Sequence, residues 1–283
     1  MVDQFPISQV SKAALLMPFS NLLNIAKAFG LLFVSIFAGV IIMMGIMFLG
    51  VVDVQALKRL PELVSSGDYA AMTGLWPLAL GYFLLIVVII AGMVHVFNYW
   101  VRLAAFGVEG AKFSSFKKAA QAAFINTLKF LLIGLLIGLI STVLTFVLNT
   151  LGLVPSFGDQ MQTAMEGDTV RLVKDTFLYS LSTSVISCFV YSLFSANLTQ
   201  TAVGDDQEGL EHPHTVDFAV VLIILYAFVI IPTLIAAFLN STVLLAIVQY
   251  GFGAYVLFTV PAAHGLRYRI CVARNHEAFD DAV

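Results

Sequence analysis

The chain has 283 residues, of which 60% are hydrophobic and 11% are charged, and its formal net charge is −3. A soluble globular domain has about 45–50% apolar and about 25% charged residues, so this composition excludes an ordinary soluble protein and a disordered chain. A net charge so close to zero gives no basis for nucleic-acid binding. Two cysteines are too few for a disulfide framework. The composition predicts an all-α integral membrane protein.

Six stretches are long and apolar enough to cross a bilayer, which takes roughly 20 residues of helix. They are residues 31–51, 75–97, 130–151, 177–194, 218–239 and 243–260. Residues 218–260 contain no charged side chain and are too long for one span, so they predict two spans joined by a tight turn at Asn240 and Ser241. The predicted organisation is an interfacial segment (1–30), a six-helix bundle (31–262) and a cytoplasmic tail (263–283).

The charges predict the orientation. If both termini lie in the cytoplasm, ten of the 14 Lys and Arg residues are on the inner side, which favours an N-in, C-in topology. Trp76 and Trp100 bracket the second span at a spacing that suits rings at the two headgroup levels, and Arg102 continues the inner belt. We therefore predict that Trp76, Trp100 and Arg102 are interfacial anchors.

The N-terminal segment has the pattern of an amphipathic helix that lies in the membrane surface, bent at Pro18. One predicted face is polar and includes Gln9, Lys12 and Ser20, and the other is apolar and includes Leu15, Leu16 and Phe19. Residues 117–129 repeat this design before the third span. Lysines at the inner surface favour anionic headgroups, although orientation signalling is the stronger explanation for them.

Two short patterns indicate a weak internal repeat of three helical hairpins. Gly-Asp pairs precede the second and fourth spans at Gly67 and Gly167. Gly107, Gly204 and Gly265 each follow an even-numbered span and are predicted to stop its helix at the inner surface. This hairpin organisation resembles uncharacterised bacterial six-helix inner-membrane families of the YciC-like kind. The resemblance concerns topology alone and implies a bacterial inner-membrane location; no residue role follows from it.

The third and fourth spans carry small and hydroxyl residues at helical spacing. Small residues let two helices approach closely in lipid, and hydroxyls can form bonds across the contact. We therefore predict that these two spans pack together along a seam, with a hydroxyl-lined cavity as the alternative. The predicted seam consists of Gly134, Gly138, Thr142 and Thr145 on one span and Ser180, Ser184, Ser187 and Tyr191 on the other.

No sequence pattern points to a catalytic site, a cofactor or a metal. Charged residues inside a membrane mark ion pathways and proton relays, and the six spans contain none. His95 lies near the inner end of the second span, where an interfacial position is the simplest interpretation. The loop from Asp205 to His214 offers carboxylates and imidazoles, which suit a partner surface or, less simply, a metal site. Phosphate-loop and zinc-protease motifs are absent from the sequence.

Four functions remain after these observations. The first is a non-catalytic membrane subunit, scaffold or assembly factor, whose partners are the lipid bilayer and another membrane protein or a second copy. The alternative is a transporter or channel for a small neutral or amphiphilic solute. A lipid-organising protein and a membrane enzyme are the remaining hypotheses.

Overall fold

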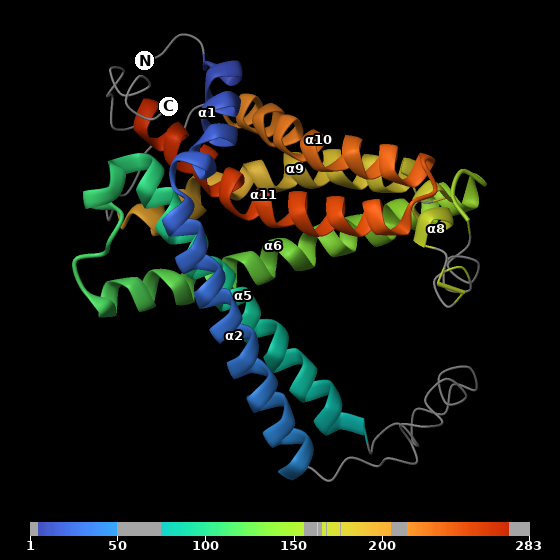
Figure 1. Cartoon of the computed structure of the whole chain (residues 1–283), viewed down its shortest axis with the longest axis horizontal. Helices are drawn as coiled ribbons and strands as arrows, with labels where there is room; N and C mark the ends of the chain where they lie inside the picture. The colour runs from blue at the N-terminus through green and yellow to red at the C-terminus, as the bar shows by residue number, and fades with distance from the viewer. Residues whose placement is uncertain are drawn as a thin grey trace. The chain divides into compact units, whose positions relative to one another are not determined.

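The computed structural model describes residues 5–49, 75–155, 163, 166–167, 169–175, 177–204 and 214–271. The loop at 205–213, both Gly-Asp pairs except Gly167, and residues 272–283 of the tail lie outside the described residues. Within the described part the chain contains helices and no strand (Figure 1). The helices are α1 (Ile7–Ser20), α2 (Leu22–Leu49), α5 (Trp76–Gly110), α6 (Phe116–Thr150), α8 (Thr169–Asp175), α9 (Phe177–Val203), α10 (Thr215–Phe238) and α11 (Thr242–Cys271).

Six of the described helices are long and apolar enough to span a membrane: α2, α5, α6, α9, α10 and α11. They coincide with the six predicted spans, so the chain has the composition and secondary structure of a multi-pass membrane protein. Most of them are longer than predicted. Helix α5 continues to residue 110 instead of 97, α6 begins at 116 instead of 130, and α11 continues to 271 instead of 260. These additions all lie on the side predicted to be cytoplasmic; the orientation itself stays a prediction.

The chain divides into two compact units, Leu23–Val96 and the remainder. In the smaller unit, α2 and the first part of α5 run antiparallel and approach each other at three glycines. Gly39 lies against Leu85, Gly81 against Met43, and Gly92 against Ser35. Small residues allow this close helix contact in lipid. His95 is exposed in this unit.

The larger unit contains α1, residues 97–110 of α5, α6, and α8 to α11. Helix α10 packs against both α9 and α11, α6 packs against α9, and α1 lies across α10 and α11 (Figure 1). Helix α8 lies at the opposite end of these helices from α1, where Val170 joins a small apolar cluster with Ala236, Ala237, Leu245 and Val248.

The turn between α10 and α11 lies where it was predicted. Asn240 has a positive φ of 52°, and its backbone N–H donates to the carbonyl of Ala237. The Ser241 hydroxyl accepts a hydrogen bond from the backbone N–H of Leu244, so it caps the start of α11. Asparagine tolerates the left-handed conformation better than most residues do, which explains why a turn this short forms here.

The three glycines predicted to stop helices behave differently. Gly107 and Gly204 both have a φ of 72°, which ends regular helix at those positions as predicted. Gly265 instead lies inside α11, so the predicted stop at this residue is wrong. A Cβ at Gly265 would overlap the carbonyl oxygen of Val101 and the Cβ of Ala104. The glycine therefore permits a close contact between α11 and the end of α5.

Helix α1 is amphipathic, but its buried face differs from the predicted one. Val10, Ala13, Ala14 and Met17 are buried, whereas Phe19 is 65% exposed. The packing of α1 against α10 and α11 selects small and medium side chains, because these let the helices approach closely. The helix ends at Ser20, and the break falls at Asn21, whose N–H donates to the carbonyl of Pro18. The bend is therefore three residues beyond the predicted one.

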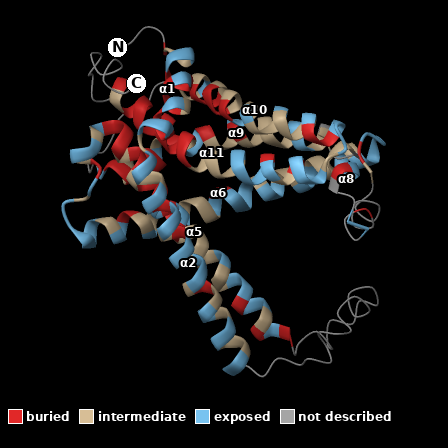
Figure 2. Ribbon diagram, viewed as in Figure 1, coloured by how far each residue is buried: buried red, intermediate tan, exposed pale blue. Residues whose placement is uncertain are grey.

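Burial in the larger unit is concentrated at one end, where α5 ends, α6 and α10 begin, and α9 and α11 end (Figure 2). We call this region the polar end. It contains a core cluster that joins Phe97, Val101 and Ala105 of α5 to Leu198 and Ala202 of α9, together with Ile133, Val203 and Tyr268. By contrast, only 6% of the most apolar stretch of α6 is buried.

Candidate functional site: a buried polar network

The polar end contains most of the buried polar side chains of the described residues. They come from α5, α6, α9 and α11, so the network links four helices. Its fully or almost fully buried members are Asn98, Asn126, Thr127, Ser192, Ser195, Thr199, Thr259, His264 and Arg267. Buried polar groups are stable only when hydrogen-bonded, so their partners decide how these helices fit together.

His264 of α11 lies at the centre of the network and is completely buried. Its Nε2 lies 3.0 Å from the Tyr191 hydroxyl, and its Nδ1 lies 2.7 Å from the Thr199 hydroxyl. The ring also makes edge contacts with the rings of Phe97 and Phe218, at centroid distances of 5.1 and 4.8 Å. A single imidazole therefore joins α5, α9, α10 and α11.

Both ring nitrogens of His264 therefore have a hydroxyl partner in α9. The Thr199 hydroxyl also lies 2.8 Å from the carbonyl of Ser195, to which it can donate. These contacts hold the imidazole between α9 and α11.

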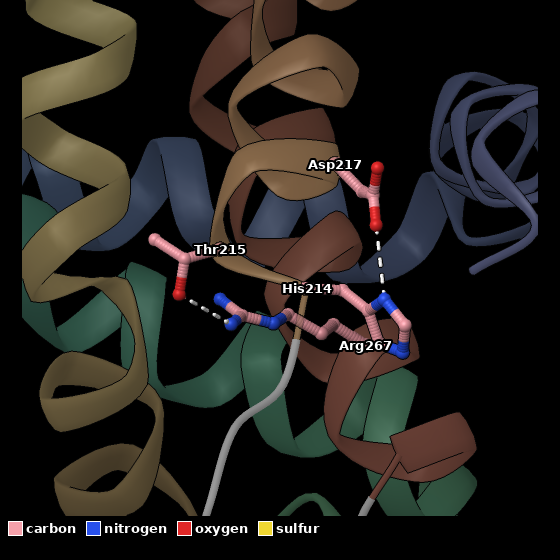
Figure 3. A network of polar contacts seen from close by, with 4 residues as sticks. All are labelled: His214, Thr215, Asp217 and Arg267. Carbon is pink, nitrogen blue, oxygen red and sulfur yellow. Dashed lines mark hydrogen bonds and ion pairs between the residues drawn. The ribbon is translucent and has the colours of Figure 1, made fainter. Parts of the chain in front are cut away.

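Arg267 lies one turn further along α11 and is 1% exposed. Its Nη1 donates to the Ser195 hydroxyl at 2.6 Å, and Nη2 lies 3.4 Å from the Thr215 hydroxyl at the start of α10 (Figure 3). The guanidinium carbon lies 4.8 Å from the centre of the Phe218 ring, which is a cation–π contact. Arg267 thus ties α11 to α9 and α10.

The start of α10 carries a hydrogen-bonded His–Asp pair beside this arginine (Figure 3). Nδ1 of His214 lies 2.9 Å from a carboxylate oxygen of Asp217. His214 has a left-handed backbone with a φ of 68° at the cap of the helix, and its ring stacks on Phe5 at 5.7 Å. His214 is the one residue of the predicted Asp205–His214 loop that the structure describes, and here it anchors the segment before α1.

Asn98 and Asn126 connect α5 to α6. The amide nitrogen of Asn126 donates to the side-chain oxygen of Asn98 at 2.7 Å and to the carbonyl of Leu198 in α9 at 3.1 Å. The amide nitrogen of Asn98 and the side-chain oxygen of Asn126 have no partner. Nearby, Trp100 packs on Phe258 at 5.0 Å with its indole N–H also unpartnered.

Two of the three predicted interfacial anchors act differently in the structure. Trp76 is 59% exposed, as an anchor should be, but Trp100 is completely buried. Arg102 is half-buried and donates to the carbonyls of Gly110 and Val203, at 2.9 and 2.6 Å. Its side chain therefore caps the last carbonyls of α9 and α5. Both corrections have one cause: the helices continue past the predicted spans, so residues expected at headgroups lie in a protein core.

The predicted seam between the third and fourth spans is also arranged differently. Helices α6 and α9 do pack together, with Tyr191 at the contact, but Ile133 and Leu198 are buried there rather than the glycines. Gly134 and Gly138 are exposed, and nothing lies within 4 Å of a Cβ built on either. The other predicted residues are partly or fully exposed: Thr142, Thr145, Ser180, Ser184 and Ser187.

Several hydroxyls of α6 and α9 donate hydrogen bonds within their own helix. Ser184, Ser192 and Ser195 donate to carbonyls three or four residues earlier in α9, at 2.6–2.7 Å. Thr142 and Thr145 do the same in α6. Among the described residues, no group of three His, Cys, Asp or Glu side chains could hold a metal ion.

The central residues, His264 and Arg267, were missed by the sequence prediction, which placed them in a cytoplasmic tail. A signal for burial was present, since Ala262, Ala263, Gly265 and Leu266 surround them with small and apolar residues. Comparisons of the chain with known protein families, with characterised proteins and with solved structures find no match.

Proposed function

We propose that the protein is a non-catalytic membrane subunit or scaffold that binds another membrane-protein chain through the open face of α6. The observation that carries this proposal is the sparse burial of α6. The most apolar stretch of this helix is the least buried among the six long apolar helices. One side of α6 packs on α9 through Asn126, Ile133 and Ile137, and the opposite side carries Leu135, Leu139 and Phe146.

The open face has a flank of small residues beside these large ones. Gly134 and Gly138 are one turn apart, and neither contributes to packing within the chain. Glycine in the middle of a helix destabilises it by roughly 0.5–1 kcal/mol relative to alanine. Close packing of a second helix against this flank would explain why these two positions are glycine, because small residues allow two helix backbones to approach in lipid.

The buried network favours a structural role over a catalytic or transport role. His264 has a partner on each nitrogen, and several hydroxyls of α9, including those of Ser192 and Ser195, donate within their own helix. Neither group is available to a substrate in this arrangement. Such a network specifies one packing of α9, α10 and α11, as a scaffold that presents a fixed face of α6 requires.

Site-specific photo-crosslinking in native membranes tests the proposal. A photoreactive side chain at Leu135, which is 72% exposed on the open face of α6, leaves both glycines in place. It is expected to give a discrete cross-linked product, whose mass distinguishes a second copy from a different protein. The matched control is a photoreactive side chain at Tyr250, which is 81% exposed on α11 rather than on α6. It is expected to label lipid alone.

Gly138→Leu supplies the second measurement. No atom lies near this position, so the variant chain is expected to fold, whereas the close approach of a second helix is blocked. Purification in mild detergent should then recover the folded monomer without the partner that accompanies the unmodified chain. Recovery of the unmodified protein as a free monomer, with no cross-linked product at Leu135, would contradict the proposal.

A further inference from the structure

A groove in the larger unit lies between α1, α10 and α11. Its volume is about 970 Å³, at the upper end of the ~300–1,000 Å³ that is usual for small-molecule sites. Its walls are largely apolar and include Ile224 and Phe228 of α10 and Ile247 of α11. Phe228 and Ile247 are 46% and 63% exposed, so the groove is open to its surroundings.

The hollow in α11 is made by a glycine. Gly251 lines the groove, and nothing lies within 4 Å of a Cβ built on it. On the side of α1, Tyr255 of α11 bounds the groove, and its hydroxyl donates to the carbonyl of Leu15. Protein interiors rarely leave space of this size unfilled. An apolar groove on membrane-spanning helices is filled by hydrocarbon, because water finds few hydrogen-bond partners there.

The α1 wall of the groove carries three further polar side chains. They are Ser8, Ser11 and Lys12. Ser11 is only 4% exposed, and its hydroxyl has no hydrogen-bond partner. The Lys12 side chain is exposed, and no salt bridge joins it to a carboxylate among the described residues. A buried hydroxyl without a partner beside an unpaired ammonium is the chemistry expected of a site for an anionic oxygen.

We infer that this groove binds an anionic phospholipid. The acyl chain lies along Ile224, Phe228 and Ile247, with its bend or end over Gly251, and the headgroup phosphate lies at Lys12 and the Ser11 hydroxyl. The groove combines an apolar trough in two membrane-spanning helices with a cation and a donor in the adjoining surface helix. A peptide would leave its backbone groups unpaired against these walls, and a phospholipid has no such groups.

Photo-crosslinking with a lipid probe tests this inference. The full-length protein is reconstituted into phosphatidylcholine vesicles that contain a minor fraction of phosphatidylglycerol with a photoactivatable acyl chain, and labelled peptides are mapped. We expect labelling of α10 and α11 around Phe228 and Ile247. Unlabelled phosphatidylglycerol should compete, and phosphatidylcholine should compete about fivefold less well, the ratio that corresponds to ~1 kcal/mol per lysine.

Two variants and one matched control make the outcome decisive. Gly251→Leu fills the hollow and is expected to reduce labelling about tenfold, equivalent to ~1.4 kcal/mol. Gly253→Leu is the control, because Gly253 also has open space around it in α11 but does not line the groove. Lys12→Gln alters an exposed side chain, so the fold is retained, and the preference for phosphatidylglycerol over phosphatidylcholine should disappear.

Three results would overturn the inference. The first is equal labelling in Gly251→Leu and Gly253→Leu. The second is an unchanged headgroup preference in Lys12→Gln. The third is labelling spread evenly over the outer faces of α6 and α9, which would indicate bulk lipid contact only. Because this groove lies on α1, α10 and α11, these results are independent of whether α6 binds a partner.

Discussion

The two ends of the larger unit are held together in different ways. At the polar end, large side chains such as Trp100, Phe218 and Phe258 are fully buried, and a histidine and an arginine are buried among them. At the other end, α8, α10 and α11 meet through a small cluster of Ala236, Ala237 and a few other apolar residues. Apolar surface gains little from burial where the surroundings are lipid, so contact between purely apolar helices depends on close packing. Large side chains and buried polar groups instead form a core at the polar end.

The comparison of the two ends indicates which groups make the fold specific. Polar groups in a low-dielectric interior are stable only in the arrangement that satisfies them, so they select one packing among many apolar alternatives. In this chain the selecting groups are His264, Arg267 and the Asn98–Asn126 pair, and all lie at the polar end. Substitutions there should have far larger effects than substitutions at similarly placed residues in the lipid-facing stretches.

The largest effect is expected from Gly265→Ala. A Cβ at this position would overlap the backbone of Val101 and the side chain of Ala104, neither of which can move freely. We expect the free energy of unfolding to fall by about 3 kcal/mol, the upper part of the usual range for overpacking. The measurement is equilibrium unfolding in mixed micelles.

Gly253→Ala in the same helix is the matched control. No atom lies near a Cβ at this position, and alanine favours helix by about 0.5–1 kcal/mol over glycine. We therefore expect unchanged or higher stability. Equal losses for the two variants would show that the ends of the unit do not differ in packing.

Arg267→Met should have the next largest effect. It keeps an unbranched side chain but removes the donors to Ser195 and Thr215 and the cation over Phe218. The expected loss is about 1.5–3 kcal/mol, typical of hydrogen bonds that involve a charged group. Lys117→Met, an exposed change in α6, should stay within about 0.5 kcal/mol. A stable Arg267→Met protein would mean that the arginine is not needed to join α11 to α9 and α10.

A double-mutant cycle at His264 gives the smallest but most specific effect. His264→Phe keeps an aromatic ring against Phe97 and Phe218 but leaves the Tyr191 hydroxyl without its hydrogen-bond partner. We expect a loss of about 1–3 kcal/mol for this variant. Adding Tyr191→Phe removes the stranded hydroxyl and should restore about 1 kcal/mol of it. Additive losses would show that the hydrogen bond between the two side chains is not formed.

Much of the secondary structure could be predicted from local pattern. The six long helices, the turn at Asn240 and Ser241, and the left-handed glycines at 107 and 204 depend on hydrophobicity and backbone preference within a few residues. The candidate site could not be predicted in the same way. Trp100 and Arg102 have the sequence signature of interfacial residues, yet they lie in or around a core because α5 continues past its apolar stretch.

Apolar length and the positions of turn-forming residues are properties of each segment by itself, so the amino-acid sequence was enough to predict six helices that are long and apolar enough to span a membrane. Tertiary structure decided which polar residues are buried, which glycines serve close packing, and which are left open. Gly265 lies against Val101 while Gly138 faces open space, although both are helical glycines next to apolar residues. The difference depends on which helix lies opposite, and that is set by the summed contacts of the whole unit rather than by any local pattern.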